Sequence, residues 1–174
     1  MTRPFTSLNP QEALHAAIFI EERNAEVYQR FAAMFHEFGD AESLEIASVF
    51  RDMAVEEKRH SDVLLVSYQD RYGNARCALT EEDLQDMIEV PRLEDGDVFA
   101  SWKTTQKSAR ERALQVALAA EKNAHDYYAR LVDETEDGPL RRLYNELSMM
   151  EDGHMIYLQS MLAASTTGSD TQVN

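Results

Sequence analysis

The sequence contains a single cysteine, Cys77, in 174 residues. This excludes an intrachain disulfide and any metal site built from paired cysteines. Glycine and proline are also scarce, at 6 and 4 copies, whereas alanine, leucine, glutamate and methionine are plentiful. That balance favours helix over sheet, so we expect an all-α protein.

Long apolar runs are absent as well. No stretch approaches the roughly 18 to 20 apolar residues that a membrane span requires, and residues 1–5 lack the apolar run of a secretory signal. Lysine and arginine number 17 against 32 aspartates and glutamates, a net charge of −15, which argues against nucleic acid as a partner. We therefore expect a cytoplasmic protein without a membrane or nucleic-acid partner, and a single domain over residues 1–174.

Four stretches repeat inward-facing residues at steps of three and four, the spacing of one face of an α-helix. The first begins at Asn9, Pro10 and Glu12, a capping-box-like start, and is expected to stop near Gly39. The predicted inward positions are Leu14, Ile18, Glu22, Ala25, Tyr28, Ala32 and Phe35; Ile46, Phe50, Met53, Glu57, His60 and Leu64; Leu114, Ala117, Glu121, Ala124 and Tyr128; Leu140, Tyr144, Leu147, Glu151, His154, Leu158 and Met161.

The spacing between these helices predicts how they are connected. Short turns join the first helix to the second and the third to the fourth, whereas residues of about 73–105 separate the second from the third. A connection of that length suits a crossover along a bundle. The sequence thus predicts two helical hairpins with one long crossover, followed by a flexible tail at about residues 165–174, which are small and polar.

The motif Glu-x-x-His occurs twice, each time on an inward stripe, and each copy follows a helix that carries one further inward glutamate. The six residues are Glu22, Glu57, His60, Glu121, Glu151 and His154. The two halves also resemble each other, because residues 22–28 align with 121–127 and residues 50–60 with 144–154. An internal repeat of this kind indicates two equivalent half-sites.

Two such half-sites form the ligand set of a dimetal carboxylate site in a four-helix bundle. Four unpaired carboxylates in a core would be costly, and no lysine or arginine lies on the four stripes to pair with them. Two divalent ions would balance the four negative charges. Carboxylate and imidazole ligands suit iron, manganese or cobalt, and we expect Glu57 and Glu151 to bridge the two ions.

Four further residues lie close to this set in the sequence. Tyr28 and Tyr127 are repeat mates that can hydrogen-bond the ligating carboxylates, although Tyr128 fits the stripe as well and an ordinary buried tyrosine is the alternative. Glu26 and His125 lie one turn beyond Glu22 and Glu121. They are accessory ligands, a route for metal access, or surface residues, and the surface role is favoured.

The order Glu, Glu-x-x-His, Glu, Glu-x-x-His resembles that of rubrerythrins and related erythrin-type proteins of the ferritin-like superfamily. The resemblance implies a ferritin-like bundle that binds two iron ions and reacts them with peroxide or dioxygen. Rubrerythrins usually carry a rubredoxin domain with four cysteines, which these 174 residues do not contain. They usually also have a further glutamate one turn beyond the third-helix ligand, where this sequence has Ala124. The remaining six-ligand set is similar to that of bacterioferritin, but Lys58 replaces its haem-ligating methionine, so no haem is implied.

By this resemblance the protein is a non-haem di-iron oxidoreductase that reduces peroxide or activates dioxygen, with two iron ions or, in a catalase-like variant, manganese. Its electrons would come from a separate rubredoxin-like or flavin partner, and a homodimer is favoured. The alternative is a ferroxidase or iron-storage protein of the bacterioferritin type. A structural bundle that holds no redox metal is the third and least favoured hypothesis.

Overall fold

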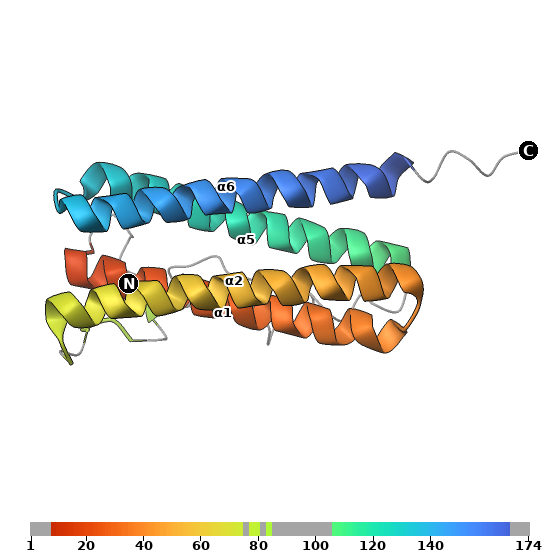
Figure 1. The fold of residues 1–174 in the computed structure, drawn as a ribbon, viewed down its shortest axis with the longest axis horizontal. Helices are drawn as coiled ribbons and strands as arrows, with labels where there is room; N and C mark the ends of the chain where they lie inside the picture. Colours follow the sequence, from red (N-terminus) through yellow and green to blue (C-terminus); the bar gives the residue numbers. More distant parts are fainter. Residues whose placement is uncertain (1–7, 75–76, 81–82, 85–105, 168–174) are drawn as a thin grey trace, which may run out of the picture.

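The computed structural model describes residues 8–74, 77–80, 83–84 and 106–167. Within them the chain forms four long helices, which confirms the predicted all-α bundle (Figure 1). These are α1 (Pro10–Phe38), α2 (Ala41–Tyr72), α5 (Gln106–Glu134) and α6 (Gly138–Thr167).

Local signals in the sequence set the helix ends. Asn9 accepts a hydrogen bond from the Glu12 amide at 3.0 Å, and the Glu12 side chain accepts one from the Asn9 amide at 2.9 Å, which completes the predicted capping box. Gly39 ends α1 in the left-handed conformation, at φ 72°, where glycine has no steric penalty. Asp40 then caps α2 by accepting from the Ser43 amide at 3.0 Å.

The second hairpin turns at Asp137, whose side chain accepts a hydrogen bond from the Leu140 amide at 2.9 Å at the start of α6. The same carboxylate pairs with Arg71 near the end of α2, at 3.0 Å. This ion pair links the two hairpins at one end of the bundle. Because Asp137 is exposed to solvent, water and salt screen this ion pair and its contribution to stability is small.

The helices pack chiefly within each hairpin, α1 on α2 and α5 on α6, and the two pairs lie against each other as two layers (Figure 1). α2 ends at Tyr72 and α5 begins at Gln106, in agreement with the predicted crossover, most of which lies outside the described residues. α6 continues to Thr167, so the first three residues of the predicted tail, 165–167, are helical. Residues 168–174 lie outside the described part of the chain.

Two apolar clusters fill the core at opposite ends of the bundle. The first core cluster includes Leu14, Leu64, Tyr128 and Tyr144, and the second includes Phe31, Phe50, Leu114 and Leu158. Every helix contributes to both clusters and carries polar residues between the two contributions. This polar belt consists of Glu21, Asn24, Glu57, His60, Ser61, Glu121, Glu151 and His154.

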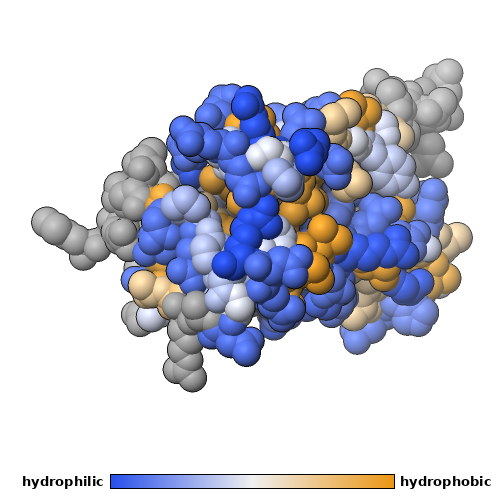
Figure 2. All heavy atoms as spheres, turned by 60° about the vertical axis from the view of Figure 1, so that its left-hand side comes forward, coloured by the Kyte–Doolittle hydropathy of each residue, from blue (hydrophilic) through white to orange (hydrophobic). Residues whose placement is uncertain are grey.

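The surface is mainly hydrophilic on the face drawn in Figure 2, with hydrophobic side chains in smaller patches. In the part of the chain that the structure describes, no helix combines the length and apolar character needed to cross a membrane.

Candidate metal centre

The polar belt contains two overlapping groups of potential metal ligands, each of which includes one of the two histidines and residues from both halves of the chain. In each group, one nitrogen or oxygen atom per residue lies within 4.8 Å of the others. The first group consists of Glu21, Glu57, His60 and Glu151, and the second of Glu57, Glu121, Glu151 and His154.

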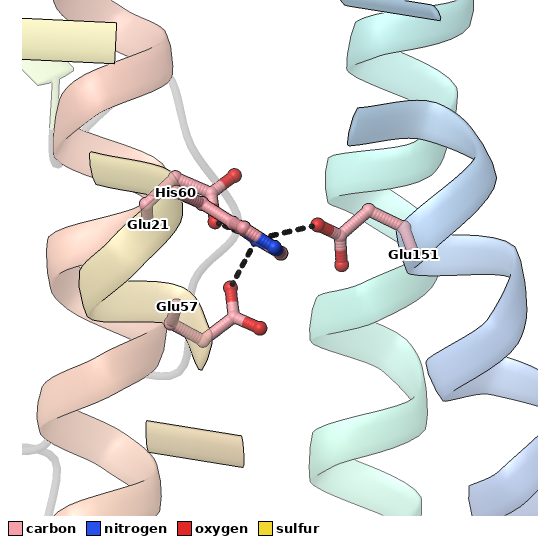
Figure 3. Close-up of side chains that lie close together, drawn as sticks. All are labelled: Glu21, Glu57, His60 and Glu151. Carbon is pink, nitrogen blue, oxygen red and sulfur yellow. Dashed lines mark hydrogen bonds and ion pairs between the residues drawn. The ribbon is translucent and has the colours of Figure 1, made fainter. Parts of the chain in front are cut away.

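The His60 side chain extends from α2 toward Glu21 on α1 and Glu151 on α6 (Figure 3). The carboxylates of the first group surround its Nδ1 atom. This nitrogen lies 3.2 Å from Glu21 Oε2, 3.5 Å from Glu151 Oε1 and 4.0 Å from Glu57 Oε2. Three carboxylates therefore converge on one imidazole from three helices.

The second group repeats this arrangement around His154 on α6. Its Nδ1 atom lies 3.1 Å from Glu121 Oε2, 3.4 Å from Glu57 Oε1 and 3.5 Å from Glu151 Oε2. Glu57 and Glu151 thus direct one oxygen toward each histidine. This is the geometry that a pair of bridging carboxylates requires, and it favours Glu57 and Glu151 for that role.

The structure brings five of the six predicted residues together but not Glu22, which is exposed. Its neighbour Glu21 is fully buried, at 0% exposure, and takes the place predicted for Glu22. Helical geometry explains the error of one residue. The predicted stripe passed through Ile18, Ala25 and Ala32, which lie at the edge of the core at 5–7% exposure. The innermost line is Leu14, Ala17, Glu21, Asn24, Tyr28, Phe31 and Phe35, at 0–1% exposure.

The tyrosine predicted for the second half of the chain is also displaced by one residue. Tyr28 donates a hydrogen bond to Glu121, as expected for an orienting residue. Tyr127 instead donates to the Ala13 carbonyl at 2.8 Å, while Tyr128 donates to Glu21. Each half of the bundle therefore holds the single glutamate of the other half through a buried tyrosine, and the correct partner of Tyr28 is Tyr128.

Glu26 and His125, the other two candidates from the sequence, lie outside both ligand groups. Glu26 is partly exposed and pairs with Arg23 at 2.9 Å and with Arg30 at 2.8 Å. His125 lies 3.2 Å from Asp126, on the surface of α5. These contacts favour the surface role over a role as metal ligands.

The electrostatics of the belt show a shortage of positive charge. All four carboxylate oxygens of Glu57 and Glu151 are buried without a hydrogen bond, and among the described residues no lysine or arginine is buried. Burial, followed by the nearby charge of Glu21, raises the pKa of Glu57 well above its usual range and that of Glu151 to about 8. Both carboxylates therefore resist ionisation in the absence of a cation.

The histidines respond in the opposite sense. Burial lowers the pKa of each, but close contacts with the surrounding glutamates and their negative charge outweigh this effect, so the pKa of His60 rises to about 9 and that of His154 to about 11. In the metal-free protein, protons thus take the place of missing cations.

The thermal stability of the metal-free protein is therefore expected to fall as pH rises from about 5 to 8. In this interval the unfolded chain releases protons that the folded protein still holds on Glu57 and Glu151, whose folded pKa values are raised. The stability present at low pH is thus lost as pH rises through the folded values. Circular dichroism melts over this range test the prediction, and metal-free Glu151→Gln should lose less stability. Equal slopes for the variant and the wild type would contradict it.

The donor set fits two divalent metal ions. Four carboxylates carry four negative charges and two ions bring four positive ones, so the unpaired oxygens of Glu57 and Glu151 gain partners and the belt becomes neutral. Oxygen and imidazole donors suit iron or manganese, whereas a site for soft metals would offer thiolates. Cys77, the only cysteine, lies outside both groups.

Besides Glu21, the structure adds a second residue that the sequence did not predict. Glu56 lies on α2, and its Oε2 atom is 2.8 Å from Nε2 of His154 across the bundle. The two residues line a surface depression of about 380 Å³ between α2 and α6, together with His60 and Met150. A carboxylate on the outer nitrogen of a metal-binding histidine orients the ring and raises its basicity. Met150 is the repeat mate of Glu56, so only one of the two histidines has such a partner from that position.

Replacing this carboxylate is expected to weaken one half of the site. In Glu56→Gln, affinity for the metal ion on the His154 side should fall about tenfold or more, while the ion on the His60 side binds as before. Anaerobic titration with Co(II), followed optically, resolves the two binding steps. Glu45→Gln, an exposed position on the same helix, is the control. Unchanged affinity in both steps would show that Glu56 does not support His154.

Comparison with known proteins relates this chain to a family whose matched span includes the metal centre. The family model for rubrerythrin matches residues 12–162, a span that contains both ligand groups. A crystal structure of an uncharacterized conserved protein from Magnetospirillum magnetotacticum MS-1 is similar, with a TM-score of 0.69 and 23% identity over 90% of this chain and 95% of that one. At this identity the likeness shows the fold alone. No match was found among curated proteins.

Proposed function

This chain belongs to the rubrerythrin family, and on that premise we propose that it is a non-haem di-iron oxidoreductase that reduces peroxide or activates dioxygen. The observation that carries the proposal is the placement of Glu57 and Glu151, each of which directs one oxygen toward each histidine. Shared carboxylates of this kind couple two metal ions in one site, whereas separate binding sites would not need them.

The six ligands and the two buried tyrosines have separate roles in this function. Glu21 with His60, and Glu121 with His154, would hold one ion each, while Glu57 and Glu151 would hold both. Iron bound there would supply electrons to the oxidant and act as a Lewis acid. Tyr28 and Tyr128 hold the two terminal carboxylates, and burial keeps both hydroxyls protonated, because it raises their pKa values well above the usual range.

The depression between α2 and α6 supports access from solvent. It is lined by His60 and His154, so a small oxidant can approach the two ligand groups without an opening of the bundle. The electron donor is proposed to be a rubredoxin-like or flavin centre outside these 174 residues, whose single cysteine cannot build a four-cysteine iron site.

The proposal is tested by loading the protein with Fe(II) under anaerobic conditions and mixing it with peroxide or dioxygen in separate experiments. We expect oxidation of the bound iron well above the rate of free Fe(II), with peroxide the faster oxidant. Rates equal to those of free Fe(II) would overturn the proposal. A preference for dioxygen, with ferric iron accumulating far beyond two ions per chain in a large shell, would support the ferroxidase and storage alternative instead.

A further inference from the structure

The proposed site does not use two buried side chains of the polar belt, Ser61 and Asn24. Ser61 donates a hydrogen bond to the Lys58 carbonyl at 2.9 Å, whereas the side chain of Asn24 makes no hydrogen bond to the described residues. It is 1% exposed, and neither its Nδ2 nor its Oδ1 atom has a hydrogen-bond partner among the described residues. A carboxamide buried in this way loses its contacts with water and gains nothing in return. Such a side chain therefore points to a partner that is not part of the polypeptide.

Helical geometry places this amide beside the metal centre. Asn24 lies on the innermost line of α1, three residues after Glu21 and four before Tyr28. Residues at these spacings are neighbours on one helix face, and side chains on a helix lean toward its N-terminus. Asn24 thus shares a helix face with Glu21, whose carboxylate is 3.2 Å from His60, and with Tyr28, whose hydroxyl donates to Glu121.

The fold itself does not require an amide at this depth. The reciprocal bonds of Tyr28 with Glu121 and of Tyr128 with Glu21 make Ala124 the counterpart of Asn24 in the second half. Ala124 is fully buried, at 0% exposure. An apolar side chain therefore serves at the matching position, and Asn24 distinguishes one side of the site from the other.

The two unpartnered atoms indicate the chemical nature of the ligand. A carboxamide offers one acceptor, Oδ1, and two N–H donors. A metal ion would use Oδ1 only and leave the donors unpaired. Dioxygen has no hydrogen, so it could accept from Nδ2 but could not donate to Oδ1. Hydrogen peroxide and water carry both an O–H donor and oxygen lone pairs, so either satisfies both atoms of Asn24.

We propose that Asn24 is a substrate-binding residue that holds hydrogen peroxide, in exchange for water, on the Glu21 and His60 side of the centre. The proposal rests on the proposed di-iron function and narrows its oxidant to peroxide. Asn24 also gives the two halves of the site different roles, because only one of them carries an amide at this depth.

The test compares Asn24→Leu, which keeps the approximate shape, with Asn24→Ser, which keeps a group that donates and accepts. With iron-loaded protein, a fixed chemical reductant and varied peroxide, we expect KM for peroxide to rise about tenfold in Asn24→Leu, the effect of losing two neutral hydrogen bonds, with little change in kcat. Asn24→Ser should recover part of the loss. Asn123→Leu, the same change at an exposed position of α5, should keep the wild-type KM.

Metal content and a crystal structure provide readouts that do not depend on turnover. Asn24→Leu should bind the same number of ions as the wild type, and a crystal structure of the zinc-loaded wild type should show a solvent molecule bonded to both Nδ2 and Oδ1 of Asn24. An unchanged KM in Asn24→Leu, or Oδ1 bound directly to a metal ion, would overturn this inference alone. Wild-type iron that reacts with dioxygen but not with peroxide would also overturn this inference alone. Failure of wild-type iron to react with both oxidants would instead overturn the proposed function.

Discussion

Glu57→Gln is expected to reduce bound iron from two ions to well under one per chain. Glu57 directs Oε2 toward His60 and Oε1 toward His154, so its loss removes a ligand from both metal positions. It also leaves three carboxylates to balance the four positive charges of two divalent ions. No hydrogen bond to the described residues holds either Glu57 oxygen, so the two metal ions are the partners that the substitution removes. Metal analysis after anaerobic loading measures the effect, and Glu45→Gln on the same helix should keep both ions.

The same variant separates loss of metal from loss of fold. Burial raises the pKa of Glu57 well above its usual range, so the neutral amide removes an unfavourable ionisation from the metal-free protein. Metal-free Glu57→Gln should therefore unfold at or above the melting temperature of the metal-free wild type near neutral pH. A variant that retains two ions, or one that loses them only because it has unfolded, would contradict the bridging role.

Glu21→Gln and Glu22→Gln are expected to differ sharply although the two residues are adjacent. Glu21 is fully buried and belongs to the ligand group around His60, whereas Glu22 is exposed and belongs to neither group. Loading with Fe(II) should yield about one tightly bound ion per chain in Glu21→Gln and two in Glu22→Gln. Because the chemical change is identical, the pair controls for general effects of removing a charge from α1.

The comparison also tests the register of α1 directly. A larger loss of iron in Glu22→Gln than in Glu21→Gln would show that α1 is rotated about its axis relative to this structure, so that Glu22 and not Glu21 faces His60. Equal losses would mean that neither carboxylate is a dedicated ligand. Either result would require a different first-helix residue in the metal centre.

Most of the fold was predictable because its signals are local. The capping box at Asn9 and Glu12 and the left-handed Gly39 fixed the ends of α1 within a residue or two. The two Glu-x-x-His motifs were placed correctly as well, because a glutamate and a histidine three residues apart must share a helix face. Their juxtaposition between two apolar clusters followed from the stripes that flank them.

The errors of one residue arose where two registers were nearly equivalent. Glu21 and Glu22 are both glutamates, and Tyr127 and Tyr128 are both buried tyrosines. The strongest local alignment of the repeat paired Asn24 with Asn123, but Asn24 is buried and Asn123 is exposed. Aligning identical residues of the two halves therefore predicts a rotation of α1 and α5 about their axes that differs by one residue from the rotation in the packed bundle. Only the contacts between halves, Tyr28 with Glu121 and Tyr128 with Glu21, decide the register.

Residues that act across the bundle were beyond local reasoning. Glu56 meets His154 from another helix, at a separation of 98 residues in the sequence, and its exposed position gives no periodic signal. Asn24 was visible as part of the repeat, but its meaning depends on the absence of a hydrogen-bond partner for either side-chain atom among the described residues. Such features require the packed arrangement of all four helices.

The central claim is that this bundle holds two metal ions between Glu57 and Glu151, and metal analysis tests it most directly. The purified protein is stripped of metal, loaded anaerobically with Fe(II), freed of excess iron and analysed for iron per chain. Two ions per chain in the wild type are predicted. A content well under one ion per chain in the folded protein would contradict the account.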